Sequence, residues 1–205
     1  VCKGINFNHQ FITMSDFVKS ELVELVGVDD KKITTIYNGL DQSIYDGVDS
    51  LLVENEKKKM GIYKESKIIG FHGRLHGEKG LDILLRAFQE VSKRFERTYL
   101  IFVGDGPERK NLEELSEQLG VSSRVIFTGF KRKEETPLYI NLMDIFVLPS
   151  KIRESFGISV IEAMAAHKPV IASRIGGVPE IIDQGIDGFL FEVGAEKELS
   201  EYLSR

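Results

Sequence analysis

Short apolar runs alternate with longer amphipathic segments along most of the chain. From residue 67 onward, runs rich in β-branched and aromatic residues are each followed by a segment in which apolar positions recur every three or four residues. Runs such as YLIFV and IFVL are apolar at every position, which is typical of parallel strands covered by helices on both faces. The pattern predicts an α/β fold with a doubly wound parallel sheet from about Gly61 onward.

The individual elements follow from the same periodicity. The predicted strands are residues 67–71, 99–103, 124–128, 145–148, 170–172 and an edge strand at 189–191. The predicted helices are residues 81–95, 107–119, 134–142, 157–166 and a short one near 179–183. Before them, HQFITMS and KITTIYNG are expected to be strands on either side of a helix around residues 16–26, and residues 41–60 a polar connector with one short helix.

Composition and charge narrow the classes of protein. The net charge is −5 and the basic residues are scattered, which argues against a nucleic-acid binder, because such a protein usually carries a basic face. Cys2 is the only cysteine, so no intramolecular disulfide and no cysteine zinc site is expected, which suits a reducing cytosol. The four histidines (His9, His72, His76 and His167) lack a metal-binding spacing. We expect no metal site.

The ends of the sequence suggest a fragment of a longer protein. The chain has no initiating Met, and its last residues, EKELSEYLSR, are predicted to be helical. Its opening lacks the basic segment and apolar stretch of a signal peptide. No apolar run approaches the roughly 20 residues that a membrane-spanning helix needs. We expect a cytoplasmic protein, with the inner face of the membrane as a place where it docks peripherally.

In doubly wound sheets, ligands bind at the carboxyl ends of the strands, where this chain carries GRLHGEKG. Gly73 allows close backbone approach there, and Arg74 and Lys79 lie five residues apart around a glycine turn. A guanidinium and an ammonium that converge at a helix entrance suit a pyrophosphate. A solvated loop is the alternative interpretation. The segment matches neither a Walker loop nor a GxGxxG turn.

A second candidate segment is ESFGISVIE, in which two carboxylates lie eight residues apart. Glu154 and Glu162 cannot share a helix face, because eight residues turn a helix about 80° past two full turns. We expect Glu154 in a loop, Gly157 at the start of the next helix, and Glu162 roughly 6–7 Å farther along it. The free amides of Phe156, Gly157 and Ile158 then point outward with the positive end of the helix dipole. This arrangement suits a nucleotide sugar. Taken in isolation, the pattern is better explained by an exposed loop acid at Glu154 and a helix acid paired with a lysine at Glu162.

Together these segments resemble family 4 glycosyltransferases. The resemblance extends in order over ITMSDFVKSELVEL, TTIYNGLD, GRLHGEKGLDILLRAF, VGDGPERKNLEEL, VIFTGF and ESFGISVIEAMAAHKPVIAS followed by IGGVPEII. It implies a B-type fold of two Rossmann-like domains that face a cleft. Residues 1–38 are then the tail of the amino-terminal, acceptor-side domain, residues 39–60 a connector, and residues 61–205 the nucleotide-sugar-binding domain. Most of the amino-terminal domain and the usual carboxyl-terminal crossover helix are outside this sequence.

The resemblance also implies roles for individual residues. Arg74 and Lys79 match the pair that neutralises the diphosphate leaving group, Glu154 the acid that holds sugar hydroxyls, and Glu162 the acid that holds the ribose diol. Glu154, Arg74 and Lys79 are expected to act in the transfer step. The expected donor-binding residues are Gly73, Arg74, Lys79, Phe130, Lys131, Glu154, Ser155, Phe156, Gly157, Ile158 and Glu162. Of these, Phe130 and Lys131 match positions that present backbone to the nucleobase.

Two further matches and one departure concern backbone geometry. Gly176 and Gly177 match the family's GG turn, which we interpret as structural. Asp105 and Gly106 are expected to form a turn and a helix start. His167 stands where the family commonly has glycine, which predicts a local change in that loop.

The resemblance implies a retaining hexosyltransferase that needs no metal or other cofactor and that works in cell-envelope polysaccharide or glycoconjugate synthesis. Its donor is then a UDP- or GDP-linked sugar, and its acceptor a glycan, a lipid or a small molecule bound mainly by the amino-terminal domain. A sugar-nucleotide epimerase and a pyridoxal-type phosphorylase are alternatives among enzymes, although no lysine context suits the phosphorylase. A non-catalytic nucleotide-binding module is the alternative from another class.

Overall fold

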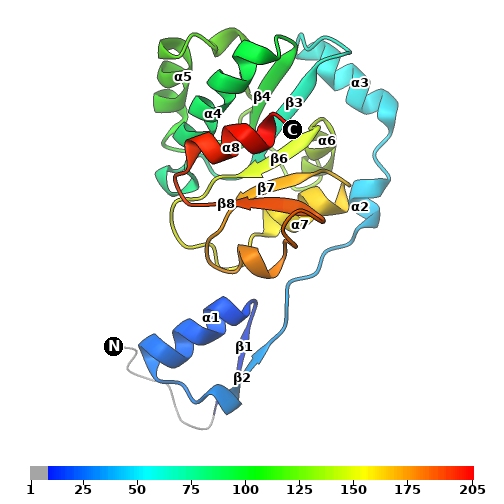
Figure 1. The fold of residues 1–205 in the computed structure, drawn as a ribbon. Coiled ribbons are helices and arrows are strands. Elements are labelled where there is room, and N and C mark those ends of the chain that lie inside the picture. The colour runs from blue at the N-terminus through cyan, green and yellow to red at the C-terminus, as the bar shows by residue number, and fades with distance from the viewer. Residues whose placement is uncertain (1–8) are drawn as a thin grey trace.

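The computed structural model describes residues 9–205, which fold into a large α/β domain and a small unit beside it (Figure 1). Cys2 and the first eight residues of the expected tail lie outside the described residues. Within the described part, no helix is both long and apolar enough to cross a membrane.

The large domain is built on a six-stranded parallel sheet. Its strands, in the spatial order β5-β4-β3-β6-β7-β8, are β5 (Val125–Phe127), β4 (Thr98–Val103), β3 (Lys67–His72), β6 (Ile145–Leu148), β7 (Val170–Ser173) and β8 (Gly188–Phe191). All five neighbouring pairs are parallel. The order changes direction between β3 and β6, so the crevice at their carboxyl ends is the place where such folds bind ligands. The predicted doubly wound sheet is confirmed.

Helices cover both faces of this sheet. Helix α8 (Glu196–Leu203) packs against β7, β8 and α4 (Leu81–Arg94), and α4 also contacts α5 (Arg109–Gln118). Helix α7 (Ile158–Ala165) packs against β6, β7 and α6 (Thr136–Asn141). Because both faces are covered, central residues such as Phe102 and Phe146 are fully buried, which explains why these strands are apolar at every position. The predicted strands and long helices are confirmed with ends shifted by one or two residues, and the short helix near Pro179 is one 3-10 turn, Val178–Glu180.

The connector contains two helices, so the prediction of one short helix was wrong. They are α2 (Ser43–Asp46) and α3 (Ser50–Lys59). The carboxylate of Asp49 accepts a hydrogen bond from the amide of Leu51 at 2.8 Å and so caps α3. Both helices pack against α6, and Tyr45 of α2 is buried in the main core. The polar composition of this segment gave no sign of the apolar contacts through which it packs on the domain.

The small unit consists of β1 (Phe11–Thr13), α1 (Asp16–Glu21) and β2 (Ile33–Thr35), with β1 and β2 parallel. The predicted helix over residues 16–26 is confirmed, but its second half, Leu22–Val26, is a π-helical turn. The unit contacts the large domain at the start of α1, where Glu180 accepts hydrogen bonds from the amides of Asp16 and Phe17, both at 2.8 Å.

Candidate functional site

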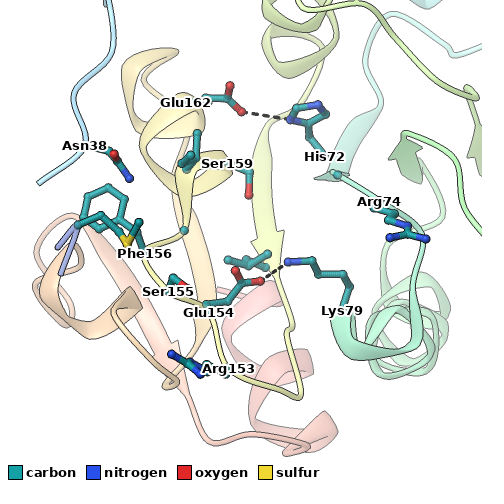
Figure 2. Close-up of a pocket in the computed structure, with 15 residues that line it drawn as sticks. Asn38, His72, Arg74, Lys79, Arg153, Glu154, Ser155, Phe156, Ser159 and Glu162 are labelled. Carbon is teal, nitrogen blue, oxygen red and sulfur yellow. Dashed lines mark hydrogen bonds and ion pairs between the residues drawn. The ribbon is translucent and has the colours of Figure 1, made fainter. Parts of the chain in front are cut away.

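A pocket of about 550 Å³ lies at the carboxyl ends of β3 and β6, beside the start of α7 (Figure 2). Nine of the eleven predicted donor-binding residues line it together: Gly73, Arg74, Lys79, Glu154, Ser155, Phe156, Gly157, Ile158 and Glu162. Sequence reasoning missed six other lining residues: Met14, Asn38, His72, Leu148, Arg153 and Ser159. Met14 and Asn38 follow β1 and β2, so both parts of the chain contribute to the pocket.

Glu154 is held by an ion pair with Lys79 from the other side of the pocket. Lys79 ends the 3-10 turn Gly77–Lys79 that precedes α4. The fully buried Ser150 donates its hydroxyl to the same Glu154 oxygen, Oε1, at 2.6 Å. The Glu154 side chain is only 14% exposed. Its Oε2 accepts no hydrogen bond from the described residues, so that oxygen is available to a ligand.

The two predicted cations do not converge in this structure. Figure 2 shows Lys79 reaching towards Glu154, whereas the guanidinium of Arg74 points away from that pair. Arg74 is exposed and forms no ion pair with the described residues. The carboxylate of Glu154 offers Lys79 a partner within the protein. Both residues nevertheless line the same pocket, and their meeting at a pyrophosphate stays a prediction.

Glu162 lies on the second turn of α7, as predicted, and both of its oxygens are engaged. The hydroxyl of Tyr45 donates to Oε1 at 3.0 Å, and Nδ1 of His72 lies 3.2 Å from Oε2. An ionised carboxylate can only accept hydrogen bonds, so this contact requires a proton on Nδ1. Burial of Tyr45 and the nearby charge of Glu162 raise the pKa of Tyr45 above its usual value of 10.0. The hydroxyl therefore remains a donor.

The start of α7 presents backbone amides to the pocket. Gly157, the residue before the helix, has a φ of 105° and carries no side chain that could cap the first turn. A β-carbon there would lie 3.3 Å from Cγ2 of Val178, so the position favours glycine. Phe156 is buried, and its ring stacks on Tyr37 with the ring centroids 5.9 Å apart. The helix therefore begins with uncapped amides and the positive end of its dipole at the pocket wall.

The GG turn holds the loop that carries Glu154, in agreement with its structural interpretation. The amide of Gly177 donates to the carbonyl of Glu154 at 2.9 Å. A β-carbon on Gly176 would lie 2.8 Å from the carbonyl carbon of Glu154. On the next residue, the carbonyl of Ser155 accepts the hydroxyl of Ser15 at 2.5 Å. The backbone at 154–155 is therefore fixed between the GG turn and the small unit.

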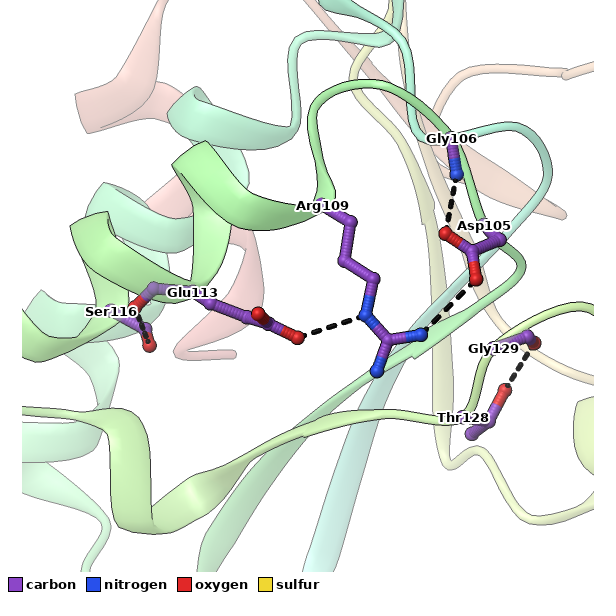
Figure 3. Close-up of polar contacts among 7 residues, drawn as sticks. All are labelled: Asp105, Gly106, Arg109, Glu113, Ser116, Thr128 and Gly129. Atoms are coloured by element: carbon purple, nitrogen blue, oxygen red, sulfur yellow. Dashed lines mark hydrogen bonds and ion pairs between the residues drawn. The ribbon is translucent and has the colours of Figure 1, made fainter.

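Asp105 and Gly106 lie in the loop before α5 (Figure 3), and the carbonyl of Gly106 accepts the amide of Arg109 at 3.1 Å in a turn that leads into the helix. The helix itself starts three residues after Gly106, later than predicted. Asp105 accepts the amide of Gly106 at 2.8 Å and the guanidinium of Arg109 at 3.1 Å. Arg109, the first residue of α5, also donates to Glu113 at 2.8 Å, so its side chain links the loop to the helix. The amide of Leu75 donates to the carbonyl of Asp105 at 2.9 Å. This loop therefore supports the neighbouring loop that carries Arg74.

Three predicted residues lie away from these clusters. Phe130 is 75% exposed, and the ammonium of Lys131 lies 4.4 Å from the ring centroid of Tyr139. Neither residue is among those that line the pocket. His167 has a φ of 55° and is the only described non-glycine residue with positive φ. Its Nε2 lies 2.6 Å from Oδ1 of Asp46. The local change in this loop relative to a glycine-containing relative stays a prediction.

The alternating α/β domain and its pocket define one Rossmann-like half of a B-type glycosyltransferase fold. The chain belongs to the family described as "Glycosyl transferases group 1", whose family model matches residues 53–205.

Several known proteins are similar to this chain. It is 35% identical over 181 residues to an uncharacterized glycosyltransferase of Methanocaldococcus jannaschii, with 87% of this chain and 46% of that protein covered. It is 32% identical over 191 residues to N-acetyl-alpha-D-glucosaminyl L-malate synthase of Bacillus anthracis, with 93% and 48% covered. The chain thus spans about half the length of these relatives. The structure of Anabaena HepE in complex with UDP and glucose aligns with a TM-score of 0.85 and 28% identity over 94% of this chain and 51% of HepE.

Proposed function

We propose that this chain is the donor-binding part of a retaining glycosyltransferase. It transfers a hexosyl group from a UDP- or GDP-linked sugar to a glycan, a lipid or a small molecule, as in cell-envelope polysaccharide or glycoconjugate synthesis. The observation that carries this proposal is the arrangement of Glu154 and Glu162 on either side of the start of α7, in one pocket with Lys79. The similarity to a protein that binds UDP and glucose supports it.

The two acids divide the donor between them in this proposal. Glu162 is four residues after Ile158, the first residue of α7, and so lies about 6 Å along the helix axis from it. It accepts the ribose diol. Glu154 lies before the helix and accepts sugar hydroxyls through its free oxygen. Carboxylates are good acceptors for hydroxyls, and neither acid has to approach the phosphates that it would repel.

The diphosphate then lies at the uncapped amides between the two acids. Breaking the bond between the anomeric carbon and the phosphate oxygen leaves negative charge on the diphosphate, and amides that already point at it stabilise that charge. An ammonium has three donors, so Lys79 can keep Glu154 in place with one of them and donate another to a phosphate. Arg74 turns towards the phosphates when they bind. The protein groups supply this stabilisation without a metal, and nucleotide binding should therefore be unchanged by EDTA.

Glu154 positions the sugar and is not a nucleophile in this proposal. Glycoside hydrolysis by a double carboxylate mechanism uses two acids that flank the reacting bond, whereas here the second acid is assigned to the ribose. The acceptor side is supplied by the amino-terminal domain, of which β1, α1 and β2 are part. Met14 and Asn38 on the pocket wall support this placement. The full protein is cytoplasmic and docks peripherally on the inner face of the membrane.

Substitution of the two acids tests the division of roles. Glu162→Ala should weaken the binding of UDP or GDP, because the ribose loses its acceptor. Glu154→Ala should spare the free nucleotide and weaken the nucleotide sugar. Calorimetric titration with UDP, GDP, UDP-glucose and GDP-mannose measures both effects, with thermal melting to check folding. Equal losses of plain nucleotide in both variants would overturn the assignment.

Lys79→Ala tests the phosphate role. The variant should bind UDP or GDP less tightly while its weak binding of the corresponding nucleoside stays unchanged, because only the diphosphate contacts the ammonium. Lys151→Ala is the matched control, since Lys151 pairs with Asp82, 2.7 Å away, and does not line the pocket. An unchanged preference for diphosphate over nucleoside in Lys79→Ala would refute the role.

An assay of the full-length protein separates the transferase from the alternatives. A transferase moves the sugar to an acceptor, an epimerase converts the donor into its epimer, and a binding module does neither.

A further inference from the structure

A buried tyrosine from the connector contacts the acid that is assigned to the ribose. Tyr45 belongs to α2 and is 117 residues away from Glu162 in the chain, yet its hydroxyl lies 3.0 Å from Oε1 of Glu162. It does not line the pocket, so it does not contact the donor. We propose that Tyr45 is a positioning residue, which fixes the carboxylate of Glu162 so that its free acceptor positions face the ribose diol. This inference rests on the proposed function.

The number of acceptor positions on the carboxylate supports this role. An ionised carboxylate has about four lone-pair positions, two on each oxygen. Tyr45 takes one on Oε1, and His72 takes one on Oε2. One position remains on each oxygen, which matches the two hydroxyls of a vicinal diol. Because each oxygen already accepts one hydrogen bond from the protein, the carboxylate cannot rotate without breaking one of them.

Tyr45 is itself held in place from several sides. Its side chain is 7% exposed and belongs to the main core cluster. The side-chain amide of Asn141, from α6, donates to the backbone carbonyl of Tyr45 at 3.0 Å. The next residue, Asp46, contacts His167. A donor held in this way keeps its direction before the ligand arrives, and fixed supporting groups of this kind hold a binding residue in its productive geometry.

The experiment compares Tyr45→Phe with Tyr139→Phe. Tyr139 is a matched control because it is 6% exposed and its hydroxyl also donates to a carboxylate, that of Glu56, at 3.0 Å, outside the pocket. Both variants keep the ring and lose one oxygen, so both should remain folded with similar small losses in melting temperature. Tyr45→Phe should weaken UDP or GDP binding on the order of three- to tenfold, the range for one lost hydrogen bond. Tyr139→Phe should leave it unchanged.

Two further measurements separate positioning from a general structural effect. The unchanged chain should prefer UDP or GDP over the 2′-deoxy form, and Tyr45→Phe should narrow that preference. In a Glu162→Ala background, Tyr45→Phe should cause no additional loss. If Glu162→Ala weakens binding but Tyr45→Phe does not, or if the two losses multiply, the inference fails while the proposed function stands. If neither UDP nor GDP binds, or if Glu162→Ala leaves binding intact, the proposed function fails and the inference fails with it.

Discussion

Replacing Gly176 by alanine tests how the loop that carries Glu154 is held. Gly176 has a φ of 58°, and a β-carbon there would lie 2.8 Å from the carbonyl carbon and 2.9 Å from the nitrogen of Glu154. Gly185 is the matched control, because its φ is 78° and a β-carbon on it meets nothing within 4 Å. The two substitutions therefore share the backbone strain and differ in the clash.

The magnitude follows from these distances. The carbonyl oxygen of Glu154 lies closer still to this β-carbon. Non-bonded heavy atoms pack at about 3.5–4.0 Å, so the Glu154 loop must move by more than about 1 Å to admit the methyl group. Left-handed backbone costs an alanine about 1–2 kcal/mol, partly offset by about 0.4–1 kcal/mol from a less flexible unfolded chain. Gly185→Ala should therefore cost about 1 kcal/mol. Overpacking adds about 1–3 kcal/mol, so Gly176→Ala should cost about 2–4 kcal/mol.

Thermal and chemical unfolding measure the difference. At roughly 2–4 °C per kcal/mol for a chain of this size, the melting temperature should fall by about 3 °C for Gly185→Ala and by about 10 °C for Gly176→Ala. Because the displaced loop carries Glu154, Gly176→Ala should also weaken UDP-glucose more than UDP in a calorimetric titration. Equal melting temperatures for the two variants would show that the close packing of Gly176 on Glu154 contributes nothing.

Three further predictions concern stability. The backbone of His167 adopts the left-handed conformation, which glycine tolerates better than alanine, so His167→Gly should be more stable than His167→Ala by about 1 kcal/mol. Equal free energies of unfolding for the two variants would argue against backbone strain. Arg109 pairs with two partly exposed carboxylates, and water screens such ion pairs, so Arg109→Met should cost less than about 1 kcal/mol. A larger loss of unfolding free energy in urea would contradict this reasoning. Hydrogen bonds from Lys59 and Tyr139 hold the pKa of Glu56 below its usual 4.5. The stabilisation from Glu56 is therefore present above about pH 4.5 and is lost as the pH falls below it. Between pH 5 and pH 3, the free energy of unfolding of Glu56→Gln should therefore fall less than that of the unchanged chain. Parallel curves of unfolding free energy against pH would show that Glu56 makes no such contribution.

The sequence by itself determined the alternating elements and the loops that meet at the pocket. Runs that are apolar at every position, such as residues 145–148, can only be buried on both faces, and the carboxyl ends of parallel strands lie at one edge of the sheet. Glu154 and Glu162 therefore lie on either side of a helix start, as their spacing predicted. These properties depend on local periodicity and on the regular geometry of helices and strands.

Only the tertiary structure decided which side chains become partners. Lys79 meets Glu154 across 75 residues of chain, and Tyr45 meets Glu162 across 117. Tyr45 stands in a polar segment that shows no strong period, so no local signal indicated its burial. Such contacts arise when separate elements pack against one another, and their choice depends on the geometry of the whole core and on no single stretch of sequence.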